Sequence, residues 1–432
     1  MKHTLHIKTL ENGTRILFVN LAASSSYYFN TINNAGFNYV DISKHELPHL
    51  LEHLAFEGSK NYPKEGQIGY ELEKLGGWYN AATSDDYIRY YLVGSMNDYK
   101  KITELALEQY TQPLFREENI NQQKSVVERE LRRKIDDDSI KVRSLAMEQL
   151  FSDKLFSLKS RIDTLKHITK LDIENYYAKT HTQANTNFVV AGDIDSKKQK
   201  EITSVIEQRI STLPVGESLH EVKKLNTSNL AKVYTLPSKL EEQMYFLVTF
   251  IKGKYDNDMQ YRAASRVVSA IYNRGDGSRI FRKSRSAGLT YGVHSGIFND
   301  EEYSELYITD KTDPHLAQKL FKLCVNELID IKNGNFTLEE LERAKGYMAG
   351  ENDTEFETSR DLADWYGPLF VAKDKLYSPK DFARAIRSVT KEDVLLVLNK
   401  FIRKDNWLIT LVGHNAINQA SGFEKIIKDS II

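Results

Sequence analysis

The stretch with the clearest potential for chemistry is residues 45–53, which read HELPHLLEH. Two overlapping metal-binding motifs occupy it. The common zinc-protease pattern H-E-x-x-H begins at His45, and the inverted pattern H-x-x-E-H begins at His49. Both patterns place two imidazoles one helical turn apart, an arrangement that pre-organises two ligands for one zinc ion. Only one of the two motifs can be the site, and the start of the helix decides which.

Pro48 selects the inverted motif. A proline inside a helix removes a hydrogen bond and clashes with the preceding turn, whereas the first helical position accepts it. We therefore expect the helix to begin near Pro48. His49, Glu52 and His53 then lie on one helical face, at positions i, i+3 and i+4. His45 precedes the helix, and we expect it to be a surface residue.

The inverted motif gives each of its polar residues a role. We expect His49 and His53 to bind zinc, because imidazole is a common zinc ligand. Glu52 is expected to act as a general base on a water molecule whose pKa the metal lowers. Five-residue motifs also arise by chance, so the alternative is a helix with two hydrogen-bonded histidines and one surface glutamate.

A catalytic zinc also needs a third protein ligand. The best candidate is Glu130, which falls on a helical wheel beside the apolar face formed by Val127, Leu131 and Ile135. An acidic side chain on a buried face needs a cation. Glu128 lies at the other edge of this face and is the weaker choice. A salt bridge to an arginine is the alternative role for Glu130.

Composition excludes several classes of function. The 432 residues include 59 Lys and Arg against 60 Asp and Glu, so no global field draws the chain to nucleic acid or to an anionic membrane. No window approaches the length of about 18 apolar residues that spans a membrane. Cys324 is the single cysteine, which excludes an internal disulfide framework. The first twenty residues contain no signal-peptide core. We expect a cytoplasmic protein.

Three short patterns recur at one interval of 221 residues. D-K-L-[FY]-S-x-K begins at 153 and 374, T-K-x-D begins at 169 and 390, and the glycine after a strand is Gly192 and then Gly413. The repeat predicts two homologous domains, 1–220 with the metal motif and 221–432 without it. Strand and helix patterns do not strictly alternate, so we predict an α+β fold in which each domain has a mostly antiparallel sheet and packed helices.

The metal stretch resembles a known family. The H-x-x-E-H motif is followed by AFEGSKNYP at residues 55–63, and together they look like the zinc peptidases that include pitrilysin, insulysin and the mitochondrial processing peptidase. In that family a glutamate 77 residues past the last motif histidine is the third ligand, and Glu130 stands at that interval from His53. The resemblance implies the paired α+β fold of LuxS and pitrilysin-like metalloenzymes, one Zn²⁺ per chain, and peptide-bond hydrolysis.

Further residues take roles through the same resemblance. Asn80 and Ala81 match the family strand that borders the metal and binds the peptide substrate by adding it to a sheet edge. Arg285 and Tyr291 match the second-half residues that place the substrate and stabilise its developing oxyanion. Gln123 stands where the family usually has a glutamate that supports a ligand or handles protons, so we expect Gln123 to lie beside the ligands and to alter the rate or the metal affinity.

Two departures from the family pattern affect these assignments. The interval before the tyrosine is one residue short, so Arg282 is an alternative to Arg285. Glu46 replaces the usual glycine three residues before the first histidine, and we expect it only to change the loop.

The resemblance predicts a zinc-dependent metalloendopeptidase that cleaves peptides or unfolded segments in a closed chamber. Short family members pair two half-clamshells. This chain has both the zinc motif and the Arg and Tyr residues, so a homodimer is favoured in which Tyr291 of one subunit serves the zinc site of the other; a heterodimer with a related subunit is the alternative. The alternative functions are a processing-peptidase subunit acting on one precursor and a non-catalytic scaffold.

Overall fold

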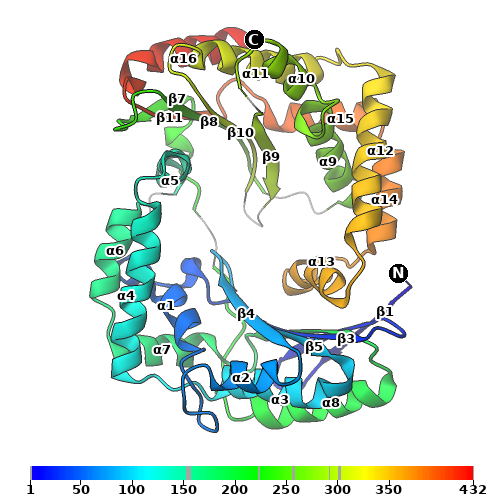
Figure 1. Cartoon of the computed structure of the whole chain (residues 1–432). Coiled ribbons are helices and arrows are strands. Elements are labelled where there is room, and N and C mark those ends of the chain that lie inside the picture. The colour runs from blue at the N-terminus through cyan, green and yellow to red at the C-terminus, as the bar shows by residue number, and fades with distance from the viewer. Residues whose placement is uncertain are drawn as a thin grey trace. The chain divides into compact units, whose positions relative to one another are not determined.

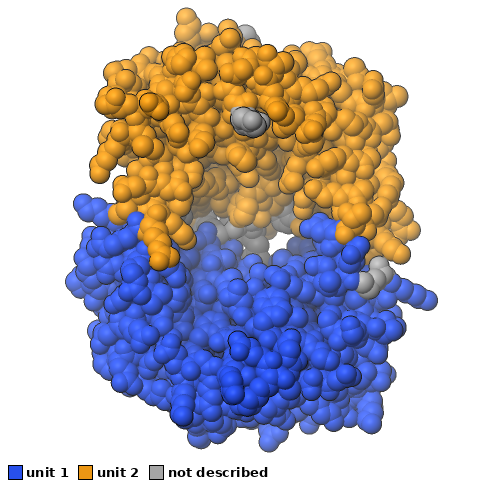
Figure 2. Space-filling model, viewed as in Figure 1, with its two compact units in different colours: residues 1–132, 158–221, 355–376 blue, residues 133–157, 222–354, 377–432 orange. Residues whose placement is uncertain are grey.

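The chain forms two compact units, each shown in its own colour in Figure 2. The computed structural model describes residues 2–151, 157–221, 224–254, 258–290, 292–299 and 303–431. Unit 1 comprises residues 1–132, 158–221 and 355–376, and unit 2 comprises residues 133–157, 222–354 and 377–432. Residues 1–220 and 221–432 thus supply most of unit 1 and unit 2, respectively, but each also contributes one segment to the other unit.

Unit 1 is built on a six-stranded sheet with the strand order β1-β2-β6-β3-β5-β4 (Figure 1). The strands are β1 (Thr4–Thr9), β2 (Arg15–Asn20), β3 (Ser26–Asn33), β4 (Trp78–Thr83), β5 (Ile88–Ser95) and β6 (Thr186–Gly192). All neighbours pair antiparallel except β2 and β6. Strand β4 therefore lies at one edge of the sheet. Strand β1, at the other edge, was not predicted from the sequence, although Leu5 and Ile7 alternate with polar residues; nearly all its residues are exposed.

Helices cover both faces of this sheet. The helices of unit 1 are α1 (Leu47–Leu54), α2 (Gln67–Glu73), α3 (Tyr99–Thr111), most of α4 (Glu117–Lys134), α6 (Leu158–Lys166), α7 (Lys170–Thr180), α8 (Ser196–Ile210) and α13 (Ser359–Val371). Alternate strand residues, among them Leu17 and Val189, pack against Leu362 and Tyr366 of α13, as the two-residue period of a strand requires. Helix α3 packs on β3 and β5.

Unit 2 repeats this plan around a five-stranded sheet with the order β7-β11-β8-β10-β9. Its strands are β7 (Lys232–Leu236), β8 (Met244–Lys252), β9 (His294–Asn299), β10 (Ser304–Thr312) and β11 (Trp407–Gly413). Its helices are α5 (Asp138–Leu150), α9 (Met259–Asn273), α10 (Arg279–Ser286), α11 (Ala317–Lys332), α12 (Leu338–Glu355), α14 (Pro379–Ser388), α15 (Lys391–Phe401) and α16 (Ala416–Ser430). Only β7 and β11 pair parallel. The predicted α+β class with mostly antiparallel sheets is confirmed.

The 221-residue interval extends far beyond the recurring patterns. It separates both ends of α4 from those of α12, and likewise α5 from α13, α7 from α15 and β6 from β11. The T-K-x-D pattern is a capping box at the start of α7 and of α15, in which Thr and Asp satisfy backbone N–H groups reciprocally. The first D-K-L-[FY]-S-x-K copy lies partly outside the described residues. In the second copy, Ser378 caps α14.

The two segments that cross between the units centre on the equivalent helices α5 and α13. Helix α5, from the first half of the sequence, packs on β8 and β11 of unit 2. The Thr410 hydroxyl donates a 2.8 Å hydrogen bond to the Val142 carbonyl, and Arg143 binds the buried carboxylate of Glu305. Helix α13, from the second half, packs on β2, β3 and β6 of unit 1. The Tyr28 hydroxyl donates a 3.0 Å hydrogen bond to Asp364.

The packing of α13 predicts a large cost for Leu362→Ala. Leu362 is 1% exposed within the unit 1 core, and truncating a buried leucine typically lowers the free energy of unfolding by about 2–5 kcal/mol. Leu171→Ala is the matched control, because Leu171 is 64% exposed. Urea denaturation followed by circular dichroism measures both. Equal unfolding free energies for the two variants would contradict the assignment of α13 to the core of unit 1.

Candidate metal centre

Helix α1 presents the inverted motif as its sequence predicts. Leu47 and Pro48 occupy its first positions, and the first helical hydrogen bond runs from the Leu50 N–H to the Glu46 carbonyl. Pro48 therefore costs the helix no hydrogen bond. Leu50, Leu51 and Leu54 are buried and fix one side of α1 in the unit, which leaves the histidines on a half-buried face.

The side chains of His49, His53 and Glu130 converge. One potential ligand atom from each lies within 4.8 Å of the other two. The nearer oxygen of Glu130 is 3.5 Å from Nε2 of His49 and 3.8 Å from Nε2 of His53. Two imidazoles and one carboxylate form a donor set typical of catalytic zinc. Glu128 takes no part, because it binds Arg132 on its own helix at 2.6 Å.

Helix α4 brings both Glu130 and Gln123 to the histidines. Val127 and Leu131 are buried and orient the helix. The Gln123 carbonyl oxygen lies 3.1 Å from Nδ1 of His53, and its amide nitrogen donates a 2.5 Å hydrogen bond to Glu57. The oxygen that faces His53 can only accept, so Nδ1 carries the proton and Nε2 keeps its lone pair for a metal.

Glu57 anchors this chain of hydrogen bonds. Asn119 donates a 2.7 Å hydrogen bond to its second oxygen. Burial raises the pKa of Glu57, and the hydrogen bonds from Asn119 and Gln123 act in the opposite direction. Both amide donors come from α4, so Glu57 also ties the loop after α1 to that helix.

Glu46 plays the corresponding part for His49. Its carboxylate is fully buried, and one oxygen lies 3.1 Å from Nδ1 of His49. The other oxygen contacts Nδ1 of His45 at 3.2 Å and accepts a hydrogen bond from Arg161 of α6. Burial acts to raise the pKa of Glu46, but hydrogen bonds from His45 and His49 and the charge of Arg161 hold it well below its usual range.

Two expectations about this region are wrong. His45 is not a surface residue: it is 5% exposed and stacks on the Phe37 ring with 4.7 Å between ring centroids. The guanidinium of Arg161 also lies over the Phe37 ring, 5.0 Å from its centroid. Glu46 does more than change a loop, because its carboxylate contacts a candidate ligand. The contact between Glu46 and His49 could have been predicted from their i, i+3 spacing, because residues at this spacing are neighbours on a helical face.

Glu52 and the predicted substrate strand lie in the same unit. The Thr83 hydroxyl, at the end of β4, donates a 2.5 Å hydrogen bond to the Glu52 carboxylate. Asn80 is exposed on β4 and its side-chain oxygen accepts from the Ala81 N–H at 2.9 Å, while Ala81 itself is buried. Helix α1 packs on β4. Glu52 is therefore close to an edge strand that has no partner on one side among the described residues.

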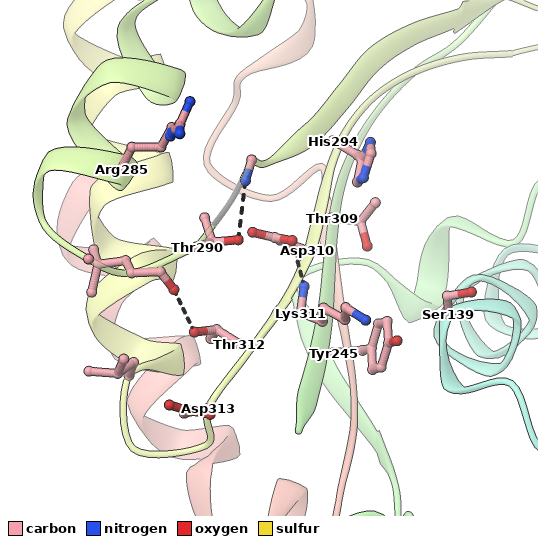
Figure 3. Close-up of a pocket in the computed structure, with 14 residues that line it drawn as sticks. Ser139, Tyr245, Arg285, Thr290, His294, Thr309, Asp310, Lys311, Thr312 and Asp313 are labelled. Carbon is pink, nitrogen blue, oxygen red and sulfur yellow. Dashed lines mark hydrogen bonds between the residues drawn. The ribbon is translucent and has the colours of Figure 1, made fainter. Parts of the chain in front are cut away.

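Of the predicted second-half residues, Arg285 lies in unit 2. Arg285 is in the last turn of α10, over the Phe281 ring at 5.0 Å. It lines a pocket of about 850 Å³ that also contains Asp310 (Figure 3). Burial raises the pKa of Asp310 to about 6, with a Thr290 hydrogen bond acting against it. Arg282, the alternative to Arg285, is exposed and does not line this pocket. Tyr291 lies outside the described residues.

Comparisons with known proteins give the family. Residues 46–159 match the family described as Insulinase (Peptidase family M16). Residues 167–348 match the Peptidase M16 inactive domain, in agreement with the lack of a metal motif in the second half. The chain belongs to this pitrilysin-type family of peptidases. Among the described residues, no helix combines the length and hydrophobicity needed to cross a membrane.

Relatives and solved structures agree with this assignment. An uncharacterized zinc protease of Rickettsia felis is 24% identical over 93% of this chain and 95% of the relative. The mitochondrial-processing peptidase subunit beta of Saccharomyces cerevisiae is 23% identical over 90% of this chain and 87% of its own length. The crystal structure of a protease from Helicobacter pylori has a TM-score of 0.82 at 19% identity and covers 95% of this chain and all of that one. At family level the chain is a zinc protease.

The geometry predicts different effects for two neighbouring glutamates. Glu130→Gln removes the carboxylate closest to both histidine Nε2 atoms. We expect zinc affinity to fall more than about 100-fold, beyond the cost typical of groups that only support a ligand. Glu128→Gln is the matched control on the same helix, and we expect no change. Titration of the metal-free protein with Zn²⁺ and a competing chelator measures both. Equal affinities would contradict a ligand role for Glu130.

Proposed function

We propose that the protein is a zinc-dependent endopeptidase whose metal is held by His49, His53 and Glu130. The convergence of these three side chains, with both histidine Nδ1 atoms hydrogen-bonded, is the observation that carries the proposal. A bound zinc ion supplies Lewis-acid chemistry and lowers the pKa of a water molecule toward neutrality. The donor set, with one carboxylate and two imidazoles held by their other nitrogen, suits this ion.

Glu52 is the general base in this proposal. It shares a helical face with the two histidines, and its carboxylate is hydrogen-bonded to Thr83 of β4. The hydrogen bond from Thr83 orients the carboxylate and leaves its other oxygen available to a water molecule. Glu52 takes the proton from the attacking water and returns it to the amine that leaves, since the same group serves as base and then as acid.

The edge strand β4 is proposed to bind the substrate. In the part of the chain that the structure describes, one side of β4 has no partner strand, so an extended peptide can add to the sheet by main-chain hydrogen bonds. Such binding reads the backbone more than the side chains and accepts varied sequences. Asn80 and Ala81 lie two to three residues before Thr83, the residue that contacts Glu52. Peptides and unfolded segments can take this extended form, whereas folded proteins cannot.

Arg285 and Tyr291 are proposed to complete the site. A guanidinium and a phenol are donors that can stabilise negative charge on the substrate carbonyl as it is attacked. The zinc-binding residues belong to unit 1 and Arg285 belongs to unit 2. We propose that a homodimer encloses the substrate in a chamber and that Tyr291 of one subunit serves the zinc site of the other.

A processing subunit is the second candidate function. The relative in Saccharomyces cerevisiae is named as one subunit of a mitochondrial-processing peptidase, which favours a role in which a partner chain contributes to a dedicated cleavage. A non-catalytic scaffold has less support, because His49, His53, Glu52 and Glu130 are all present. Chemical cross-linking of the purified chain, alone and in extract, distinguishes a homodimer from a mixed complex.

Glu52→Gln tests the reaction. We expect the variant to bind one zinc ion per chain with unchanged affinity and to lose about 10²–10⁴-fold in kcat, the range for a missing general acid–base. A library of quenched fluorescent peptides of mixed sequence reports cleavage, and zinc is measured by atomic absorption. A wild-type protein that holds zinc stoichiometrically and cleaves no member of the library would rule out the endopeptidase.

Subunit mixing tests the shared site. Glu52→Gln and Tyr291→Phe chains are each expected to be inactive as pure homodimers. After subunit exchange, a mixed dimer has one site with both wild-type residues, so we expect about one quarter of wild-type activity at equal amounts. A mixture of Glu52→Gln with Glu52→Gln/Tyr291→Phe chains is the control and is expected to stay inactive. No recovery despite exchange seen by native mass spectrometry would contradict the cross-subunit arrangement.

A further inference from the structure

The N-terminus of α1 holds a buried charged cluster that no family pattern assigns: Glu46, His45, Arg161 and the ring of Phe37. We propose that Glu46, held by Arg161, is a positioning residue that sets the tautomer and orientation of His49 for zinc. The inference rests on the zinc site proposed above and extends it. The family resemblance implies no role for Glu46, which stands where a glycine is usual, so the inference goes beyond that resemblance.

The side chain of Glu46 is committed to this cluster. Glu46 is the N-cap residue of α1, and its carboxylate makes no capping hydrogen bond to the helix. It is instead 0% exposed and directed at His49, His45 and Arg161. A buried carboxylate without compensation is strongly unfavourable. Arg161 supplies the compensating charge from α6, 115 residues further along the chain.

The donors around Glu46 require a carboxylate rather than an amide. Arg161 can only donate, and it occupies one oxygen. His49 uses the second oxygen through Nδ1, 3.1 Å away. Each oxygen therefore has to accept, which a glutamine cannot do with both ends of its side chain. Because the carboxylate accepts from Nδ1, the lone pair of His49 is at Nε2, the atom 3.5 Å from Glu130.

His53 shows the same requirement met by different chemistry. Its Nδ1 partner is the amide of Gln123, and the amide nitrogen has its own acceptor in Glu57. Among the described residues, no Lys or Arg donates to the Gln123 oxygen, whose hydrogen-bond partner is His53. An amide therefore suffices beside His53, whereas the presence of Arg161 makes the charged form necessary beside His49. A carboxylate on the far nitrogen also makes an imidazole a better electron donor to a metal.

Glu46→Gln tests the proposal through metal binding rather than catalysis. Arg161 is expected to hold the amide oxygen, so the amide nitrogen would face Nδ1 of His49 and favour the tautomer with its proton on Nε2. We expect zinc affinity to fall about 10–100-fold, as is typical when an outer-shell partner is lost. Competition between the metal-free protein and a zinc chelator measures this, with folding checked by circular dichroism.

The double variant Glu46→Gln/Arg161→Met provides a rescue. Without Arg161 the amide can turn its oxygen to His49 and its nitrogen to His45, whose neutral Nδ1 can accept. We expect most of the lost zinc affinity to return. If the cluster had only a structural role, the double variant would bind zinc more weakly than the single variant, because it alters two residues of the cluster instead of one.

Two controls make the result decisive. Glu305→Gln alters an equally buried carboxylate paired with Arg143 in unit 2, and we expect wild-type zinc affinity. Wild-type affinity in Glu46→Gln, or an equal loss in Glu305→Gln, overturns the inference. If Glu46→Gln does not fold, Glu46→Gln/Arg161→Met is compared with Glu46→Ala/Arg161→Met, which lacks the acceptor; weaker binding by the latter supports the inference and equal binding overturns it. Wild-type protein that binds no zinc refutes the proposed function instead.

Discussion

A metal-binding histidine must offer one unprotonated nitrogen in a fixed direction, and on α1 the hydrogen bonds at Nδ1 impose that condition twice. The acceptor for His53 is an amide on α4, backed by Glu57. The acceptor for His49 is a carboxylate tied to α6 by Arg161. The three helices α1, α4 and α6 must therefore pack together before both imidazoles are correctly presented. The geometry of the metal centre therefore depends on the packing of these three helices in unit 1.

The sequence predicted the parts of this site that depend on local geometry. Pro48 marked the start of a helix because its backbone restriction acts within one turn. The interval to Glu130 came from a family resemblance, and the apolar face around Val127 agreed with it. The surroundings of Glu46 and His45 were not predictable in this way, because Arg161 reaches them from a helix 115 residues away. A charged residue in a loop is usually exposed, so burial by a distant partner leaves no mark in the local pattern.

The equivalent helices α4 and α12 carry different side chains at matching positions of the repeat. Helix α12 occupies in unit 2 the position of α4 in the repeat. At the 221-residue interval, Ala344 replaces Gln123 and is fully buried, while Glu351 stands where Glu130 does. Glu351 pairs with Arg274 at 3.7 Å. In unit 2 an arginine thus pairs with the carboxylate whose equivalent in unit 1, Glu130, faces two imidazoles. Ala344 has no amide that could support a histidine as Gln123 does.

The crossing of α5 and α13 also constrains how such a chain could arise. Each half of the repeat carries one helix that covers the sheet of the other half. A single repeat made as a separate chain would leave its own sheet uncovered on that face, and the helix meant for its partner would be exposed. Two identical copies would complete each other by exchanging this helix, which is the arrangement of a domain-swapped dimer. In the present chain this exchange takes place between the two halves of one molecule.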